Sequence, residues 1–242
     1  MKRMWTIPAI IGCVLVAWIT FEGVRFAWLL GQSAKLVKQS QAFERRIDGG
    51  SPRILIAGDS TAVGTGTTPE GSTAGRFGAD FPRAHIRNVS VNGWKIVDLL
   101  AAFPTDESFD LAVLQIGAND IMRGTPEKEF ETSLRALFEK ATAAGTNVVA
   151  LHSGNVGLAP MFRWPVSAVM RARSLRYRAI YKKVAADHGV AYVDLYKEKG
   201  EDVLVDNIPK HYADDLLHLT ADGYGTWYDA IRKAMREAGM AL

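Results

Sequence analysis

The sequence predicts an α/β fold in which a parallel sheet of about five strands is covered by helices on both faces. Short apolar runs of strand length recur along the chain, and a segment with helical periodicity separates each run from the next. This alternation is typical of parallel sheets, because the connection between two parallel strands crosses the sheet and usually does so as a helix. The expected strands are residues 53–58, 84–91, 111–116, 147–151 and 190–193.

Length and composition fit one globular domain with an appendage. The chain has 242 residues, of which 48% are hydrophobic. The 29 basic residues exceed the 26 acidic residues by only three, and no basic tract with interleaved aromatics is present, so no nucleic-acid partner is expected. The single cysteine, Cys13, excludes an intramolecular disulfide and a thiolate metal site. Because the apolar run continues after Cys13, we interpret it as a helix residue and not as a lipoprotein acylation site.

The amino-terminal segment has the composition of a membrane span. Residues 4–21 contain no charged side chain, and at roughly 1.5 Å per residue a helix of this length comes close to crossing a hydrocarbon core. Trp18, Ile19 and Phe21 occupy the place where a cleavable signal peptide has a small-x-small site. We therefore predict an uncleaved transmembrane anchor in residues 1–30.

Basic residues on either side of the span predict its orientation. Lys2 and Arg3 precede the span, and Arg25, Lys35 and Lys38 follow it. The positive-inside rule is therefore nearly balanced between the two sides. We predict a cytoplasmic amino terminus, with the rest of the chain exported to the periplasmic or extracellular side.

Residues 31–52 are expected to form a juxtamembrane helix and a linker. Leu36, Ser40, Phe43 and Ile47 would fall on one face of a helix, and a Gly- and Pro-containing stretch follows them. The segment would act as a short tether, with the rest of the chain at its membrane-distal end.

Three helical patterns lie between or after the expected strands. In residues 126–144, apolar side chains recur on one face, with Thr125 as the expected cap, Pro126 at the first helical position and Gly145 as the stop. Similar apolar faces run through residues 166–184 and 224–235. Helices at these places could cover the two faces of the sheet.

The stretch Arg-Ile-Leu-Ile-Ala-Gly-Asp-Ser-Thr, which begins at Arg53, places Ser60 on the turn that leaves the first strand. An open α/β sheet keeps its chemistry at the carboxyl ends of its strands. A phosphate-binding loop is excluded by spacing, because Pro69 stands where a dinucleotide fingerprint needs its third glycine, and no Gly-Lys-Ser/Thr follows. The alternative is a serine nucleophile, which needs a base, an orienting acid and an oxyanion hole.

Candidates for these groups follow other strands or precede the last helix. Asp215 lies three residues before His218, a spacing at which the carboxylate can reach the imidazole in a turn. Asn119 follows the strand at 111–116, and its amide could donate to an oxyanion. Gly93 follows the strand at 84–91 and could offer a backbone N–H at close range.

With these four blocks, the sequence resembles the SGNH hydrolases, also called GDSL-like esterases and lipases. The resemblance covers the chain from about Arg53 to its end, so residues 53–242 are the expected hydrolase domain. Thr61 replaces the leucine that usually follows the serine in this family, and it leaves the nucleophile intact. The blocks are Gly58-Asp59-Ser60, Gly93, Gly117-x-Asn119-Asp120 and Asp215-x-x-His218.

The resemblance implies a flavodoxin-like three-layer α/β/α sandwich and a serine esterase or lipase. Ser60 would attack the ester carbonyl, His218 would take its proton and Asp215 would orient His218. The N–H groups of Ser60 and Gly93 and the amide of Asn119 would hold the oxyanion. The partner would be an acylated small molecule, lipid or glycan, and no cofactor or metal is implied.

Some residues have alternative roles. His152 ends a strand and competes with His218 as the base, and Asp214 competes with Asp215 as the acid. Asp59 and Asp120 are interpreted as loop-supporting residues.

Other functions remain open at this point. An O-acyltransferase acting on a glycan would use the same residues. A non-catalytic glycan- or lipid-binding module could keep the same fold. An α/β-hydrolase is a further alternative, because Gly58-x-Ser60 approximates the nucleophile elbow of that fold.

The apolar loop 156–165 is either a satellite core or an acyl-binding wall. The basic residues 163–183 form either a solvated face or a contact with anionic headgroups.

Overall fold

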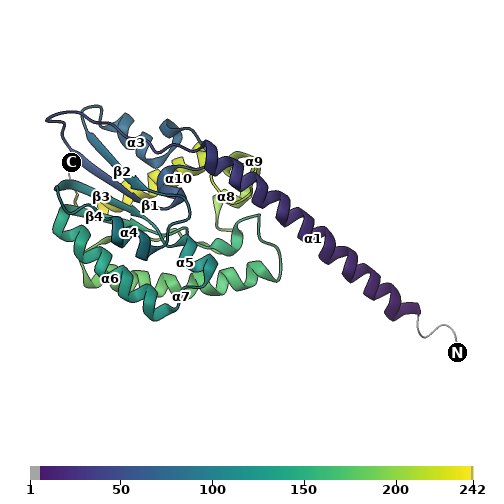
Figure 1. Cartoon of the computed structure of the whole chain (residues 1–242). Coiled ribbons are helices and arrows are strands. Elements are labelled where there is room, and N and C mark those ends of the chain that lie inside the picture. The colour runs from purple at the N-terminus through teal and green to yellow at the C-terminus, as the bar shows by residue number, and fades with distance from the viewer. Residues whose placement is uncertain (1–5, 241) are drawn as a thin grey trace.

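The computed structural model describes residues 6–240 and 242, and it confirms the predicted α/β sandwich with a parallel sheet (Figure 1). The strand order is β2-β1-β3-β4-β5, with every neighbouring pair parallel, and this is the flavodoxin-like order. The strands are β1 (Arg53–Gly58), β2 (His85–Ser90), β3 (Phe109–Gln115), β4 (Gly145–Leu151) and β5 (Ala191–Val193).

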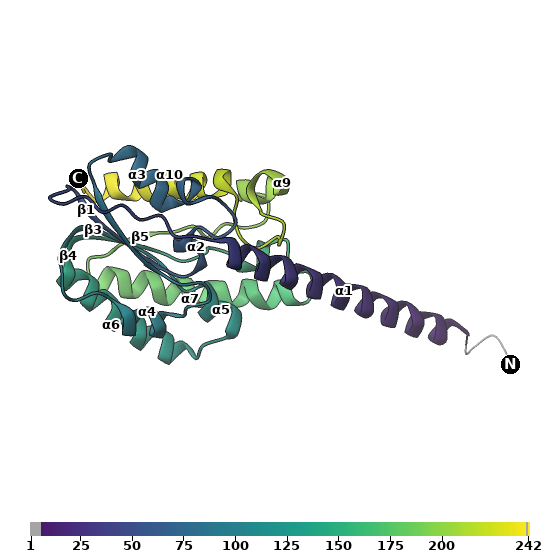
Figure 2. The same ribbon diagram turned by 45° about the horizontal axis from the view of Figure 1, so that its top comes forward.

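Alternate residues of the strands pack into two separate cores. Leu55 and Ala57 of β1 face a core with α4, α6 and α7, whereas Ile54 and Ile56 face a core with α3 and α10. Figures 1 and 2 show the two helical layers on opposite faces of the sheet. The covering helices are α3 (Thr73–Asp80), α4 (Ile96–Ala102), α6 (Glu127–Ala144), α7 (Val166–Asp187) and α10 (Ala221–Glu237). Short helices are α2 (Ser60–Val63), α5 (Ala118–Arg123), α8 (Val203–Asp206) and α9 (Ile208–His211), with 3₁₀ turns η1 (Pro69–Gly71) and η2 (Val156–Leu158).

The start of α6 differs from the expectation by one residue. Pro126 is the cap and not the first helical residue, so the prediction of Thr125 as the cap was wrong. The Thr125 hydroxyl instead donates to Asp120 Oδ1 at 2.9 Å, because this buried carboxylate lies beside it. Gly145 ends the helix as predicted and also begins β4.

The amino-terminal helix α1 (Thr6–Gln39) is continuous through the expected anchor and the first part of the juxtamembrane segment. It is long and apolar enough to cross a membrane, from Pro8 onward. Lys2, Arg3 and the first residues of the expected span, Met4 and Trp5, lie outside the described residues. The prediction of a helix through Phe43 and Ile47 was wrong, because the helix ends at Gln39.

Residues 40–52 run along the edge of the sheet. Arg45 forms an antiparallel bridge with Ile86 of β2, with N–H···O distances of 3.0 and 2.8 Å. The Arg45 guanidinium donates to the carbonyls of Gly78, Phe81 and Ala84. The unpaired backbone of an edge strand is a ready partner for an extended segment, and this pairing competes with helix formation. The segment is therefore fixed to the domain and does not act as a free tether.

The second half of α1 packs beside the carboxyl edge of the sheet, and its first half projects away from the domain (Figure 2). Leu29 is fully buried. Arg25 Nη2 donates to the Met161 carbonyl at 2.8 Å, and Glu22 pairs with Arg163 at 2.6 Å. The helix is therefore joined to the loop between η2 and α7.

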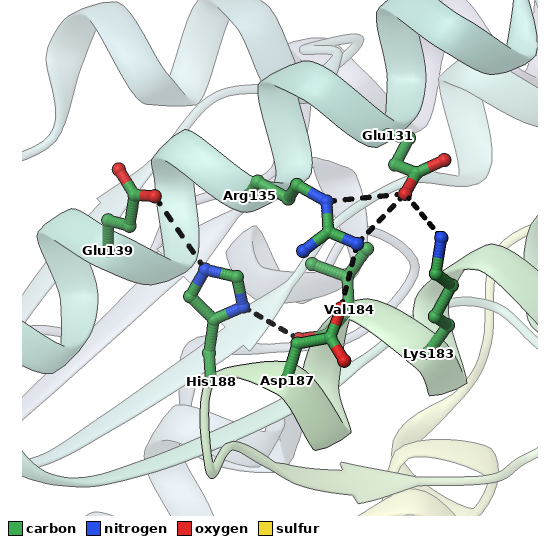
Figure 3. A network of polar contacts seen from close by, with 7 residues as sticks. All are labelled: Glu131, Arg135, Glu139, Lys183, Val184, Asp187 and His188. Atoms are coloured by element: carbon green, nitrogen blue, oxygen red, sulfur yellow. Dashed lines mark hydrogen bonds and ion pairs between the residues drawn. The ribbon is translucent and has the colours of Figure 1, made fainter.

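The basic side chains of α7 pair with neighbouring carboxylates. Figure 3 shows Lys183 paired with Glu131 of α6, which also accepts from Arg135. The Lys183 Nζ–Glu131 Oε1 distance is 3.0 Å. Elsewhere on α7, Arg171 pairs with Glu198, Arg176 with Glu127 and Arg178 with Asp194. These pairs favour the solvated face over the contact with anionic headgroups, since the charges are already compensated within the domain.

Candidate active site

Ser60 lies at the start of α2, directly after β1. Gly58 is required before it, because a Cβ at that position would lie 1.9 Å from the Gln115 carbonyl oxygen of β3. Asp59 caps α2, and its Oδ1 accepts from the Thr61 N–H at 2.9 Å and from the Thr61 hydroxyl at 2.8 Å. The threonine that replaces the family's leucine thus contributes to the cap of the turn.

The structure brings Ser60, His218 and Asp215 together. His218 Nε2 lies 3.0 Å from Ser60 Oγ, and His218 Nδ1 lies 2.5 Å from Asp215 Oδ2. Asp215 is fully buried and His218 is 8% exposed. The three side chains form a continuous hydrogen-bonded chain from a buried carboxylate to a hydroxyl at the cavity surface.

The turn that carries Asp215 is held by its own backbone. Asp215 Oδ1 accepts from the N–H groups of Leu217 and His218, at 3.1 and 2.9 Å. Leu216 takes a left-handed conformation with φ of 57°, and its carbonyl accepts from the Met161 N–H at 2.9 Å. Burial acts to raise the pKa of Asp215, but the bonds and charge of His218 and the two N–H groups outweigh it and leave this pKa below its usual value.

Gly93 and Asn119 meet at the same cavity from two different loops. Asn119 Nδ2 donates to the Trp94 carbonyl at 3.0 Å, which joins the loop after β3 to the loop after β2. An amide nitrogen carries two N–H groups, so a second donor is present at this position. Gly93 has φ of 85°, a conformation that favours glycine. Ser60, Gly93, Asn119 and His218 all line the cavity.

Two buried carboxylates support these loops, as expected for Asp59 and Asp120. Asp120 Oδ2 accepts from the Ile96 N–H at 3.0 Å and thereby ties the Asn119 helix to the start of α4. Burial raises the pKa of Asp120 and raises the pKa of Asp59 to about 6. Neither carboxylate is hydrogen-bonded to His218, whose ring bonds to Asp215 and Ser60.

The alternative base and acid lie elsewhere. His152 is 2% exposed, its Nδ1 accepts from the Gly154 N–H at 3.0 Å, and its Nε2 lies 2.9 Å from the Tyr192 hydroxyl. Asp214 is exposed to solvent, whereas its neighbour Asp215 is buried against His218. The geometry therefore disfavours both alternatives.

The cavity has a volume of about 200 Å³. Val156 and Ala159 of the apolar loop line it, as expected for an acyl-binding wall, while Met161 is buried and Trp164 is 72% exposed. Sequence reasoning missed several lining residues because they come from segments far apart in the chain. These are Ser33 and Val37 of α1, Leu195, Leu204, Tyr212 and Trp227.

Within residues 6–240 and 242, no group of three or more His, Cys, Asp or Glu side chains is placed to hold a metal ion.

Several solved structures share this fold. LAE5, an alpha/beta hydrolase enzyme from the metagenome of Lake Arreo, superposes with a TM-score of 0.58 at 20% identity over 77% of this chain and 96% of its own. TesA gives 0.58 at 19% identity, over 77% and 99%. The acetylxylan esterase Axe2 of Geobacillus stearothermophilus gives 0.56 at 19% identity, over 79% and 96%. A search of curated protein sequences found no match.

The sequence also matches a protein family. Residues 56–225 match the GDSL-like lipase/acylhydrolase family, and the chain belongs to this family. The resemblance to SGNH hydrolases predicted from the four sequence blocks is thereby confirmed, and the protein is an ester hydrolase of this type.

Proposed function

We propose that this enzyme hydrolyses carboxylic esters through an acyl-Ser60 intermediate. The hydrogen-bonded chain Asp215–His218–Ser60, with distances of 2.5 and 3.0 Å, supports the proposal most strongly. An imidazole needs a fixed tautomer to accept a proton from serine, and a buried carboxylate on its other nitrogen provides this. Asp215, His218 and Ser60 are the proposed catalytic residues.

In the first half of the reaction, the Ser60 Oγ–H proton passes to His218 Nε2 as Oγ attacks the carbonyl carbon. The C–O bond of the ester then breaks, and the His218 proton goes to the departing alcohol oxygen. In the second half, His218 takes a proton from water, the hydroxyl attacks the acyl carbon, and the proton returns to Ser60 Oγ as the acid leaves.

The oxyanion of each tetrahedral intermediate is proposed to accept from the N–H groups of Ser60 and Gly93 and from the Asn119 amide. These groups line one cavity, and Asn119 is positioned through its bond to the Trp94 carbonyl. Loss of one such donor typically costs about 10²–10³ in kcat. We expect a loss of that size for Asn119→Ala with little change in KM.

The test uses the full-length protein in detergent with aryl esters of graded acyl length. Ser60→Ala should abolish hydrolysis, whereas Asp214→Asn, which changes an exposed carboxylate, should not. Equal activity of wild type and Ser60→Ala would refute the acyl-serine mechanism. The chain-length profile separates an acetylesterase, as Axe2 is described, from a lipase. A glycan added as acceptor tests for acyl transfer, which would replace hydrolysis if ester on the glycan exceeded free acid.

We further propose that α1 anchors the enzyme in a membrane and that the hydrolase domain lies on the extracytoplasmic side. The length and apolarity of α1 support the anchor. The basic residues on the two sides of the span nearly balance, and the proposed orientation places Lys2 and Arg3 in the cytoplasm because Arg25, on the other side, is compensated by Glu22. Reporter fusions at the carboxyl terminus, beyond Leu242, test the orientation. A reporter that is active only in the cytoplasm would refute it.

A further inference from the structure

The apolar surface of α1 continues beyond the point where charge first appears in its sequence. Glu22 and Arg25 face the domain, where they pair with each other and with Arg163 and the Met161 carbonyl. Their side chains are only 16% and 14% exposed. The side chains exposed on the same stretch of helix are apolar, and they include Val24, Trp28 and Leu30. The charged residues therefore do not mark the end of the lipid-facing surface.

The length of this surface fits a bilayer better when it includes residues beyond Glu22. The part of α1 from Thr6 to Phe21 spans about 24 Å, less than a hydrocarbon core of about 30 Å. The nine further residues to Leu30 add about 13 Å, enough for the helix to cross the core and reach the headgroup region. A leaflet boundary near Leu30 would also cover apolar side chains that are otherwise exposed to water.

A second apolar surface lies beside the same part of α1. Trp164 is 72% exposed, and Val166 and Val169 at the start of α7 are also exposed. Arg163, next to Trp164, is the partner of Glu22, so this loop lies at the level of the helix where the charges are covered. Tryptophan is enriched at membrane interfaces because its ring has an apolar body and a polar N–H.

The active-site cavity opens close to this level. Ser33 and Val37 of α1 line it, and along the helix they lie about 5 and 11 Å beyond Leu30. Figure 2 shows α1 leaving the domain from the side of the sheet where α2 and α5 begin, which is the edge that carries Ser60 and Asn119. Ser40 at the end of the helix also accepts from Asn92 Nδ2 at 3.0 Å, next to Gly93.

We propose that the apolar surfaces of α1, of the loop before α7 and of the start of α7 are seated in the leaflet, and that the cavity takes its acyl substrate from that leaflet. We define this surface, the leaflet face, as Val24, Trp28, Leu30, Trp164, Val166 and Val169. The substrate class is an acyl ester of a membrane lipid, whose acyl chain enters along α1 past Ser33 and Val37. The inference rests on the proposed function of Ser60 for the chemistry, but the depth of the leaflet face is independent of it.

The first experiment measures how deeply the leaflet face lies in the bilayer. In a Cys13→Ser background, single cysteines at Val24 and Trp28 carry a polarity-sensitive fluorophore, and the protein is placed in vesicles of phosphatidylethanolamine and phosphatidylglycerol. Lipids with a nitroxide on the acyl chain quench probes within the hydrocarbon. Cysteines at Val16 and Lys38 give the reference values for lipid and water. We expect probes at Val24 and Trp28 to be quenched like the probe at Val16. Quenching as weak as at Lys38 would overturn the proposal.

The substrate is tested by comparing two activities of the same variants. The double variant Trp28→Ser/Trp164→Ser should lose about tenfold or more of its fatty-acid release from vesicle phospholipid, because it seats less deeply. Its hydrolysis of a soluble short-chain aryl ester should stay near wild type, since neither residue lines the cavity. Val97→Ser, an exposed valine on α4, is the matched control for loss of surface apolarity and should change neither rate.

The outcomes separate this proposal from the proposed function. Absence of phospholipid hydrolysis by wild type, or equal loss of both activities in the double variant, would overturn the lipid substrate. Full soluble-ester activity of Ser60→Ala would instead refute the acyl-serine mechanism and leave the depth measurement standing. Both proposals are supported if the probes at Val24 and Trp28 are quenched like the probe at Val16, if the double variant loses activity only on vesicles, and if Ser60→Ala is inactive.

Discussion

Two histidines at the carboxyl edge of the sheet are both buried but differ in their partners. His218 is 8% exposed and lies between Asp215 and Ser60. His152 is 2% exposed and lies between the Gly154 N–H and the Tyr192 hydroxyl. Burial disfavours the charged form of an imidazole unless a nearby carboxylate compensates. The comparison supports the buried acid, and not the position at the sheet edge, as the feature that would equip His218 for the proposed proton transfer.

The surroundings of His152 favour its neutral form. Its Nδ1 accepts from a backbone N–H, so in the neutral ring Nε2 carries the proton and donates to the Tyr192 oxygen. Burial lowers the pKa of His152 to about 4. The ring also makes edge contacts with Tyr181 in the core. His152 thus has the features of a structural residue that joins β4 to β5.

The largest expected effect comes from exchanging each histidine for glutamine. His218→Gln should lower kcat by roughly 10⁴–10⁶, because the proposed base is lost. His152→Gln should leave kcat nearly unchanged. Steady-state hydrolysis of an aryl ester measures both. If folded His152→Gln lost as much kcat as His218→Gln, the assignment of His152 as structural and His218 as the base would be wrong.

The adjacent acids provide the second comparison. Asp215→Asn should lower kcat by about 10⁴, since an amide favours the wrong tautomer of His218. Asp214→Asn, one residue away and exposed, should have no comparable effect. The same ester assay applies, with circular dichroism as the control for folding. Equal kinetics of the two variants would mean that His218 is not oriented by Asp215.

The third effect is on the pH dependence of the free energy of unfolding. His152 binds a proton below about pH 6.5 in the unfolded chain, but only near pH 4 in the folded chain. The free energy of unfolding therefore falls as the pH falls from about 6.5 to 4, by up to ~3 kcal/mol. Asp59, with its pKa raised to about 6, acts in the opposite direction because the folded state gains its proton first.

The contribution of His152 is isolated by urea unfolding of wild type and His152→Gln from roughly pH 7 to 4, since Asp59 is common to both proteins. Wild type should lose stability relative to the variant as the pH falls. Parallel curves for the two proteins would show that His152 is not held neutral by burial.

The smallest expected effect is that of Tyr192→Phe. It removes the hydroxyl partner of His152 Nε2, which should lower the free energy of unfolding by about 1 kcal/mol. Ester hydrolysis should remain at the wild-type rate, because Tyr192 does not line the active-site cavity. A large fall in kcat would indicate a link from His152 to the reaction.

Much of the fold was predictable because strands and helices follow local patterns. The strand at 53–58 and the stop at Gly145 depend on neighbouring residues and agree with the structure. The cap of α6 and the end of α1 were mispredicted. In both cases a group outside the predicted helix decided the outcome: the carboxylate of Asp120, five residues earlier, binds Thr125, and the edge of β2 pairs with Arg45. Such competition cannot be read from local periodicity.

The candidate site was predictable for a different reason. Ser60, Asp215, His218, Gly93 and Asn119 lie in short blocks whose order and spacing resemble one family, and the family is confirmed over residues 56–225. Their arrangement follows from the parallel sheet, which brings strand ends to one edge. The choice between His218 and His152 was less secure from sequence, since each lies at a position that could reach that edge.

The sequence by itself determined the family, the order of the strands along the chain and the residue types of the candidate site, because these are encoded in short segments. Only the tertiary structure decided how α1 meets the domain. The burial of Glu22 and Arg25 and the approach of Ser33 and Val37 to the cavity depend on partners more than 100 residues away, such as Met161 and His218. Hydrophobic periodicity specifies which face of a helix is apolar, but packing alone determines what that face contacts.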